Sequence, residues 1–558
     1  MRLKYTLPFA LLLSGCQTAS FEQKNAPESK TQTLATEEKT PVYVSSSDIT
    51  SQSPDPEGFD VTTNQLVDTE SPLDDVLVND TRSSSDTSAA HKIEDTPQNQ
   101  EDVWQRIAMQ MSLKTPNHSS VEYYRKWFLR NPSHMRTVAK RAEPFLYLIT
   151  TKVEERGMPL ELALLPVVES SFDAFAYSHG RAAGLWQFVP GTGKRFGLDQ
   201  DFWYDGRRDV SASTDAALDY LTYLNKRFDG SWELAIAAYN SGGGRVSGAV
   251  KKNKRLGKPI DFFSLSLPKE TSGYVPKLLA LADLVANQEK YGINIPSIAN
   301  KPVVQVVEPK EQLDLAIAAN YAGISLKQLQ SLNPAYNQWS TAPKKNQNLL
   351  LPIHAVDTFT HNLEKNKGKG VKTIRYKVKS GDVISVIAQK YQTTSQIIRD
   401  ANQLRNNNIR VGQHLLIPTA TKGNEAYTLS ANNRLKKTQS KARGQYKVTH
   451  TVASGDSFWT IARKHKVSHQ SLAKWNGMAP RDTLRIGQKL VVWKKGEQGS
   501  IIRTVYYSVR SGDSISRIAS KFKVRSSDVV KWNHLNKSKY LQPGQKLKLY
   551  VDVTKVTL

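Results

Sequence analysis

One carboxyl group stands out among the residues of this chain that could do chemistry. Glu169 ends the apolar run 164–168 and is followed by Ser170-Ser171-Phe172. A carboxyl group that emerges from apolar packing loses hydration, which disfavours its charged form and raises its pKa. Such a group can act as a general acid and protonate a glycosidic oxygen near neutral pH. The other interpretation is a surface glutamate that caps or pairs at the end of a helix.

Further polar residues follow Glu169 along the chain. They lie in three runs, which read Ser178 to Ala183-Gly184-Leu185-Trp186-Gln187-Phe188, then Ala238-Tyr239-Asn240-Ser241-Gly242, then Glu270-Thr271-Ser272-Gly273-Tyr274-Val275. Asp173 could be proposed as a second carboxylate, which would make a hydrolase, but we interpret it as structural. For Phe172, Trp186 and Phe188 we expect places in the core, because large aromatic side chains are usually buried.

The segment that must position these residues, 104–300, has helical patterns and little strand signal. We expect four helices, which are one opened by Pro159 and distorted by Pro166, one over 217–228 capped by Ser213 and Thr214, one over 232–240 stopped by Gly242-Gly243-Gly244, and one over 278–285. The segment is therefore predicted to be a mostly α domain.

Three repeats occupy the basic end of the chain. Each has a Ser-Gly-Asp turn, at Gly381-Asp382, Gly455-Asp456 and Gly512-Asp513, and an Asn 20 residues after the Asp. Alternating apolar residues before the turn and helical patterns after it predict β-α-α-β units, with the Asp capping the first helix. We place the units at 374–418, 446–493 and 504–550, with a linker at 419–445. A degenerate fourth copy at 304–353 has Leu313 at the Asp position and lacks the turn.

The chain begins with the three parts of a secretory signal peptide, over residues 1–15. Leu13-Ser14-Gly15-Cys16 resembles the bacterial lipobox, in which the cysteine is lipidated, and Gln17 after it points to the outer membrane. The alternative is an ordinary buried cysteine near a plain cleavage site. Residues 17–103 hold 18 acidic and 5 basic residues, so we expect a disordered acidic tether over 16–103.

Composition excludes several classes of protein. No apolar run among the 558 residues is long enough to span a bilayer, and the single cysteine excludes internal disulfides. The net charge is +26, and residues 372–558 hold 36 basic against 9 acidic residues, which favours a polyanionic partner. Nucleic acid, peptidoglycan with its carboxylates, and a merely solvated positive face all fit that charge. No metal cluster, phosphate loop or aromatic-basic stacking pattern appears, so we expect no metal, no cofactor and no nucleic acid.

These motifs resemble known families. The repeats resemble the LysM module, which binds the N-acetylglucosamine-containing glycans of peptidoglycan and chitin. The order of the Glu-Ser, Gly-Leu-Trp-Gln, Ala-Tyr-Asn and Glu-Thr-x-x-Tyr runs resembles the lytic transglycosylase domain with the goose-type lysozyme-like fold. With the lipobox in front, the whole chain resembles the membrane-bound lytic murein transglycosylase D family. The resemblance implies a mostly α lysozyme-like catalytic domain followed by small β-α-α-β LysM modules.

The resemblance also implies a reaction and a set of site residues. Glu169 matches the family's sole catalytic carboxylate, which cleaves between N-acetylmuramic acid and N-acetylglucosamine and leaves a 1,6-anhydro end. The resemblance places Ser170 and Ser178 at the acetamide, Gln187, Tyr239 and Asn240 along the cleft, and Tyr274 beside Glu169. Sugar binding by the repeats is expected at their glycine-aspartate turns. One departure is Ala174-Phe175, where the family often has proline after the aspartate.

Two other functions stay open from the sequence, a hydrolytic muramidase and a non-catalytic LysM lipoprotein that binds the cell wall. The expected location is the outer membrane of a Gram-negative bacterium, facing the periplasm, with peptidoglycan strands as the partner. The sequence does not predict an oligomeric state.

Overall fold

The computed structural model describes residues 95–345, 347–495, 502–536, 540–553 and 556. The predicted signal peptide 1–15, Cys16 and most of the predicted acidic tether 16–103 lie outside the described residues. Within the described ranges, no helix is long and apolar enough to cross a membrane.

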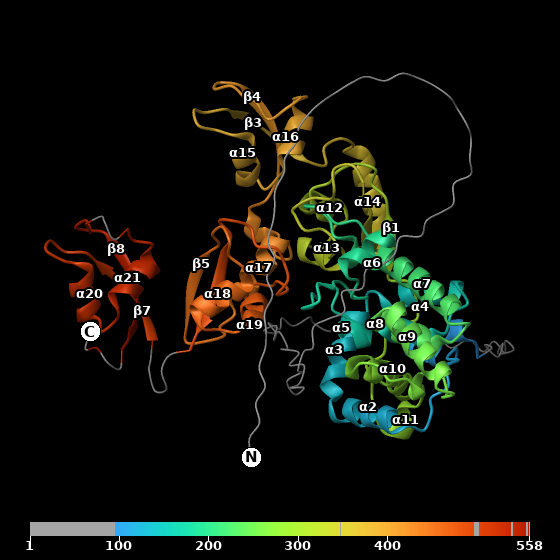
Figure 1. Cartoon of the computed structure of the whole chain (residues 1–558). Helices are drawn as coiled ribbons and strands as arrows, with labels where there is room; N and C mark the ends of the chain where they lie inside the picture. The colour runs from blue at the N-terminus through green and yellow to red at the C-terminus, as the bar shows by residue number, and fades with distance from the viewer. Residues whose placement is uncertain (1–94, 346, 496–501, 537–539, 554–555, 557–558) are drawn as a thin grey trace, which may run out of the picture. The chain divides into compact units, whose positions relative to one another are not determined.

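Residues 95–300 form a helical domain (Figure 1). Its α-helices are α1 (Val103–Ala108), α2 (Ser119–Arg130), α3 (Pro132–Ala142), α4 (Leu146–Glu155), α5 (Leu165–Ser170), α6 (Pro190–Arg195), α7 (Val210–Arg227), α8 (Trp232–Ser241), α9 (Gly243–Arg255), α10 (Lys269–Ala286) and α11 (Gln288–Tyr291). Its 3₁₀ turns are η1 (Pro97–Asn99), η2 (Leu160–Leu164), η3 (Gly206–Arg208) and η4 (Phe262–Ser264). The described residues 95–303 contain no β-strand, so the prediction of a mostly α domain is confirmed.

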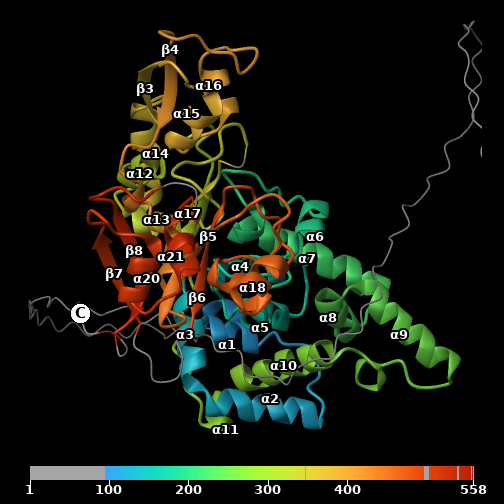
Figure 2. The ribbon, with the colours of Figure 1, turned by 60° about the vertical axis from the view of Figure 1, so that its left-hand side comes forward.

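Helix α10 forms the centre of this domain. Its apolar residues from Val275 to Val285 are almost wholly inaccessible to solvent. It contacts α1, α2, α5 and α8, and Figure 2 shows α2 and α10 running side by side. Because an apolar helix in this position loses most of its hydration on folding, its burial anchors the helices that surround it.

Two prolines divide the segment before Glu169. The sequence predicts one distorted helix after Pro159, whereas the structure has the 3₁₀ turn η2 followed by the short helix α5. Pro166 lies in the first turn of α5. Backbone N–H groups in a first turn have no acceptor within the helix, so the missing N–H of proline costs no hydrogen bond there. The chain thus starts a new helix at Leu165, and Glu169 falls in its last turn.

Three other helix boundaries differ from the prediction. The N-cap of α7 is Asp209, which accepts from the Ala212 amide, while Ser213 and Thr214 lie inside the helix. Gly242, at a φ of 88°, ends α8, but the two glycines after it begin α9. Helix α10 begins at Lys269 rather than at residue 278. At each of these boundaries a stronger cap or a tertiary contact decides where the helix begins or ends, and the hydrophobic periodicity of the sequence does not show either of them.

The segment 304–365 contains the strands and two helices expected of the degenerate module at 304–353, followed by a further helix. It consists of β1 (Val304–Val307), α12 (Leu315–Tyr321), α13 (Leu326–Leu332), β2 (Leu349–Pro352) and α14 (Ile353–Lys365), with β1 and β2 antiparallel. Its core shares residues with the helical domain, since Trp203 and Tyr204 pack into it while Leu332 and Leu350 pack into the helical core. The Asp205 amide also donates to the Ala335 carbonyl at 2.9 Å. The two cores therefore interlock.

The three repeats have the predicted β-α-α-β order, each with a two-stranded antiparallel sheet and a core of its own. Repeat 1 has β3 (Lys372–Lys377), α15 (Ile384–Lys390), α16 (Ser395–Ala401) and β4 (His414–Thr419). The segment after it contains η5 (Asn424–Ala426) and α17 (Ala431–Ser440). Repeat 2 has β5 (Tyr446–Thr451), α18 (Phe458–His465), α19 (His469–Trp475) and β6 (Lys489–Lys494), and repeat 3 has β7 (Ile502–Ser508), α20 (Ile515–Lys521), α21 (Ser526–Asn533) and β8 (Lys546–Asp552).

The repeated asparagine fastens the second helix of each unit to its closing strand. The Asn476 amide donates to the Leu472 and Val491 carbonyls, and its oxygen accepts from the Val491 amide at 2.7 Å. The same pattern joins Asn402 to Leu416, Asn533 to Lys548 and, in the degenerate module, Asn333 to Leu350. Its constant spacing thus reflects a side chain that replaces a backbone partner.

The repeated aspartate closes the turn and is not the helix cap that the sequence predicts. Asp382 accepts from the Lys379 amide and from the Tyr376 hydroxyl at 2.8 and 2.7 Å. Asp513 does the same with Arg510 and Tyr507. The N-cap is the next residue in each repeat, at positions 383, 457 and 514. The glycines before the aspartates have φ of 80 to 83°, a backbone conformation that favours glycine.

Repeat 2 replaces the aromatic pair of its neighbours with two histidines. His450 occupies the position of Tyr376 and bonds Asp456 through Nε2 at 2.8 Å, while its Nδ1 lies 3.1 Å from His465 Nε2. Both rings are buried. Burial, together with the charges of Lys531, His450, Lys494 and Lys464, lowers the pKa of His465 to about 3.

Repeat 2 should therefore lose stability in acid while repeats 1 and 3 do not. The pKa of His465 is depressed in the folded chain, so its contribution is complete above the unfolded value of about 6.5 and falls as the pH drops below it. The loss is about 1.4 kcal/mol per pH unit, or about 2 kcal/mol at pH 5. Amide exchange protection factors of the full chain at pH 7 and pH 5 measure it repeat by repeat.

A matched control installs the residues of repeat 1. The double variant His450→Tyr with His465→Tyr reproduces the pair Tyr376 and Tyr391, whose rings pack at 5.9 Å. Its repeat 2 should keep its protection at pH 5. Equal acid sensitivity in the variant, or none in the parent chain, contradicts the role of the histidine pair.

Candidate active site

Glu169 lies in the last turn of α5 and faces helix α10. The residues before it, Leu164 to Val167, are buried, whereas Glu169 itself is half-buried. The Tyr274 hydroxyl on α10 donates a hydrogen bond to Glu169 Oε1. The carboxyl group is therefore fixed by one neutral donor while part of the residue stays accessible.

The surroundings of this carboxyl group raise its pKa well above the ordinary value of a glutamate. Burial raises the pKa of Glu169 to about 7, against the opposing effects of the Tyr274 hydrogen bond and the Lys277 charge and with a small further increase from Glu270. An acid with a pKa near the working pH can both give and take a proton at useful rates. The expectation of a raised pKa at this position is confirmed.

The backbone turns sharply directly after Glu169. Ser171 and Phe172 have φ of 52° and 59°, and the Phe172 side chain is buried. The left-handed region costs a residue other than glycine of the order of 1 kcal/mol or more, and such residues cluster at active sites. Arg141 donates to the Ser171 carbonyl at 3.2 Å and helps to hold the turn.

Ser170 uses its hydroxyl within the protein. Its Oγ donates toward the Pro166 and Leu185 carbonyls, both at 3.0 Å. This contact ties the end of α5 to the loop that carries Gln187. Ser178 differs, because its Oγ accepts from the Ala182 amide at 3.0 Å and its own proton has no acceptor among the described residues. Ser178 therefore retains a donor for a ligand.

Arg207 holds both ends of the loop 181–188 by hydrogen bonds. The buried guanidinium donates to the Arg181 and Phe188 carbonyls and pairs with Asp205 at 2.8 Å. Gly184 lies against this support at a φ of 80°, and a Cβ there would come within 1.9 Å of the Arg207 carbonyl oxygen. Only glycine fits this approach.

Gln187, Tyr239 and Asn240 line the same region. Gln187 has a φ of 49° and donates to the Gly184 carbonyl at 2.8 Å. The Tyr239 hydroxyl, on α8, donates to the Trp186 carbonyl at 2.8 Å. Burial and then the charge of Glu169 raise the pKa of Tyr239, which places it in the same neighbourhood. Asn240 accepts from the Thr271 hydroxyl at 2.8 Å.

The remaining predicted residues have structural roles here. Phe172, Trp186 and Phe188 are buried in the helical core, as expected. Asp173 accepts from the Phe175 amide at 2.9 Å and closes a turn. Within the described part of the chain, no group of three His, Cys, Asp or Glu side chains could hold a metal ion.

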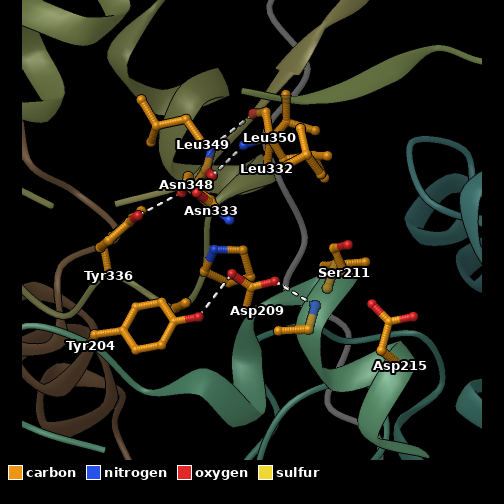
Figure 3. A pocket seen from close by; sticks show the side chains of 15 residues that line it. Tyr204, Asp209, Ser211, Asp215, Leu332, Asn333, Tyr336, Asn348, Leu349 and Leu350 are labelled. Carbon is orange, nitrogen blue, oxygen red and sulfur yellow. Dashed lines mark hydrogen bonds between the residues drawn. The ribbon is translucent and has the colours of Figure 1, made fainter. Parts of the chain in front are cut away.

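Two features near the site escape sequence reasoning. Lys277, one turn after Tyr274, acts on the Glu169 charge, and a basic residue one helical turn from a predicted contact is the signal that could have found it. The Asp205–Arg207 support has no such signal, because it depends on the fold. A separate pocket of about 210 Å³ lies between the start of α7 and the degenerate module, lined by Tyr204, Asp209 and Asn333 among others (Figure 3). No residue predicted for chemistry lines this pocket.

Comparison with known families defines the class of protein. Residues 147–262 match the Transglycosylase SLT domain, residues 376–418, 450–493 and 507–549 match the LysM domain, and residues 303–368 match the LysM-like domain of the lytic transglycosylase MltD. The helical domain with Glu169 at its centre is thus a lytic transglycosylase domain of the SLT type, followed by LysM modules.

Individual relatives narrow the assignment. The chain is 36% identical over 405 residues to membrane-bound lytic murein transglycosylase D of Escherichia coli (strain K12), covering 71% of this chain and 86% of the relative. It therefore belongs to the membrane-bound lytic murein transglycosylase D family, and it is an enzyme. An autolysin of Enterococcus faecalis is 31% identical over 195 residues, 33% of this chain and 25% of that protein. The solved structure of the 70 kDa soluble lytic transglycosylase Slt70 from Escherichia coli is 22% identical with a TM-score of 0.22, covering 34% of this chain and 32% of that one.

Removing the Tyr274 hydroxyl should move the pH range in which the enzyme works. In Tyr274→Phe, Glu169 loses the donor that stabilises its carboxylate, so its pKa should rise further above about 7. The alkaline limb of kcat/KM should then shift by about one pH unit to higher pH. Tyr123→Phe, at an exposed tyrosine of α2, is the matched control and should leave the limb in place. A shift to lower pH, or none, contradicts the role of Tyr274.

Proposed function

We propose that Glu169 protonates the oxygen between N-acetylmuramic acid and N-acetylglucosamine in murein. The observation that carries the proposal is the half-buried carboxyl group with its pKa near 7 and its hydrogen bond from Tyr274. Protonation turns the N-acetylglucosamine oxygen into a neutral hydroxyl leaving group. Positive charge then develops on the muramic acid ring.

A single carboxylate carries this chemistry. Most glycosidases use two, separated by about 5 to 9.5 Å. Here Asp173 closes a turn, and Glu270, on the exposed first turn of α10, acts on Glu169 only through its charge. We infer that the acetamido oxygen of the sugar stabilises the positive centre in place of a second carboxylate. Glu169, now ionised, takes the proton of the 6-hydroxyl while that oxygen bonds to C1, which closes the 1,6-anhydro ring without water.

The other predicted residues would bind and orient the saccharide. Ser178 has a free hydroxyl proton that suits the acetamide oxygen. Ser170 would act indirectly, through its hold on the loop that carries Gln187. Tyr239 and Asn240 are half-buried at the end of α8. They would contact the sugar through the donor and acceptor positions that their hydrogen bonds within the protein do not use. These assignments rest on the family motifs and on the shared neighbourhood of Glu169.

The repeats would hold the enzyme on its insoluble substrate. We place glycan binding at the turns of Gly381-Asp382, Gly455-Asp456 and Gly512-Asp513. Because the aspartate carboxylates are engaged within their turns, backbone groups would make most of the sugar contacts. The surplus of basic residues in 372–558 would add attraction to the stem-peptide carboxylates.

Lipidation of Cys16 would keep the enzyme on the outer membrane, facing the periplasm. The support is the lipobox sequence Leu13-Ser14-Gly15-Cys16 with Gln17 after it, and the membrane-bound relative in the same family. Several acyl chains bury enough methylene groups, at about 0.8 kcal/mol each, for stable anchoring.

Product analysis tests the chemistry. Wild-type enzyme should convert purified murein to fragments with 1,6-anhydro ends, which lack one water relative to hydrolysis products in mass spectra. Glu169→Gln keeps the shape but has no acidic proton and should lower the rate at least about 10³-fold. Asp173→Asn is the matched control and should stay active, because its side-chain oxygen can still close the turn. Reducing ends from the wild-type enzyme would instead indicate a hydrolytic muramidase.

Truncation tests the role of repeats 2 and 3. A chain that ends after Gly444 keeps repeat 1, the two interlocked cores and Tyr427, which packs into the second of them. It should cleave soluble glycan strands at an undiminished rate but should sediment less with intact sacculi. The deficit should grow with salt, because screening weakens the remaining charge attraction. Equal sedimentation of both chains at low and high salt contradicts the proposed role.

A further inference from the structure

A half-buried lysine without a partner among the described residues lies near the catalytic carboxyl group. Lys277 follows Tyr274, whose hydroxyl donates to Glu169, by one turn of α10. The residue is half-buried, and its ammonium group forms no hydrogen bond or ion pair within the described part of the chain. Buried or half-buried lysines are normally paired, because an unpaired charge loses hydration without compensation.

The neighbourhood of Lys277 is electropositive on several elements. Arg141, on α3, donates to the neutral carbonyl of Ser171 and has no ion-pair partner among the residues that the structure describes. His134, also on α3, has a buried Nε2 without a hydrogen-bond partner, and burial followed by the charges of Lys277 and Arg141 lowers its pKa to about 4. Burial lowers the pKa of Lys277 itself, and Glu169 is the carboxyl group that opposes this effect.

The remaining groups that face Glu169 are known. They are the Tyr239 hydroxyl from α8 and Tyr274 and Glu270 from α10, of which only Glu270 carries a negative charge, on an exposed first turn. The lysine charge thus works against the acid, since it stabilises the carboxylate form of Glu169. Lys277 has no carboxylate of the protein as an ion-pair partner within the described part of the chain, and an anionic group of the substrate would supply one.

We propose that Lys277 is a specificity-determining residue that binds a carboxylate of the stem peptide on the muramic acid whose bond is cleaved. The inference rests on the proposed function of Glu169. Stem peptides are attached to the muramic acid and not to the N-acetylglucosamine, so their carboxylates arrive on the same sugar whose glycosidic oxygen takes the proton. Pairing would cancel the lysine charge and favour the protonated form of Glu169 only when a peptide-bearing strand is bound.

Three substrates separate the charge of the peptide from its bulk. They are strands with intact stem peptides, strands whose stem-peptide carboxylates are converted to amides, and strands stripped of peptides by an amidase, whose newly formed lactyl carboxylates are also converted to amides. The wild-type enzyme should cleave the first with a kcat/KM about tenfold above the other two. The alkaline limb of kcat should also lie at higher pH for the first substrate, since kcat reports the bound complex.

Variants of one helix supply the controls. Lys277→Met should reduce the preference to near one and remove the difference between the alkaline limbs, whereas Lys277→Arg should keep both. Lys269→Met removes a lysine charge from the exposed first turn of the same helix and should keep the preference. Thermal unfolding of each variant shows whether the domain stays folded.

Three results overturn the proposal. The first is equal cleavage of all three substrates by the wild-type enzyme. The second is an equal kcat/KM for the strands with amidated and with acidic stem peptides. The third is a Lys277→Met variant that slows every substrate by the same factor with unchanged alkaline limbs. Failure of the proposed function looks different, because then no substrate yields 1,6-anhydro ends with the wild-type enzyme.

Discussion

The dehydration of one carboxyl group is the constraint on which the proposed chemistry of this protein depends. Glu169 is placed at the end of a six-residue helix, where apolar packing removes water and the Tyr274 hydroxyl replaces part of it. Full exposure would leave the group ionised at neutral pH, and burial without a donor would leave it protonated and unable to take a proton back. The fold supplies both influences from different helices, so their balance exists only in the folded domain.

The surrounding architecture keeps that balance in place. Two residues in the left-handed region, Ser171 and Phe172, turn the chain away from the carboxyl group, and their strain is offset by the burial of Phe172. The Asp205–Arg207 pair supports the loop that carries Gln187, and Gly184 allows the backbone to approach it. Precision at the site thus comes from buried charge pairs and close backbone contacts as well as from apolar packing.

The sequence predicts the parts of this molecule that depend on local pattern. Glu169 after an apolar run, the helical domain and the β-α-α-β repeats all follow from periodicity and spacing, and the family motifs identify Tyr274 as the partner of Glu169. The helix cap predicted at the repeated aspartate lies at the next residue, and the aspartate closes the turn. The sequence does not separate the two roles, because turns and helix caps use the same residue types. Pro166 is compatible with either a kink or a new helix start, and only tertiary packing decides between them.

Other features could not be predicted because they join distant segments. Arg207 meets the carbonyls of residues 181 and 188 only once the helices have packed, and no spacing in the chain announces it. The histidine pair of repeat 2 is visible in the sequence as a replacement of two aromatic residues, but its burial and its hydrogen bond to Asp456 require the sheet and helix to close on it.

The interlocked cores of the helical domain and the degenerate module separate two kinds of modularity in one chain. Trp203 and Tyr204 of the helical domain lie in the core of the degenerate module, and Leu332 and Leu350 of the module lie in the core of the helical domain. Repeats 2 and 3, by contrast, close around their own apolar residues. Modules with separate cores can be duplicated, lost or exchanged during evolution without disturbing their neighbours. The degenerate module has no such freedom and must be inherited together with the enzyme as a single hereditary block.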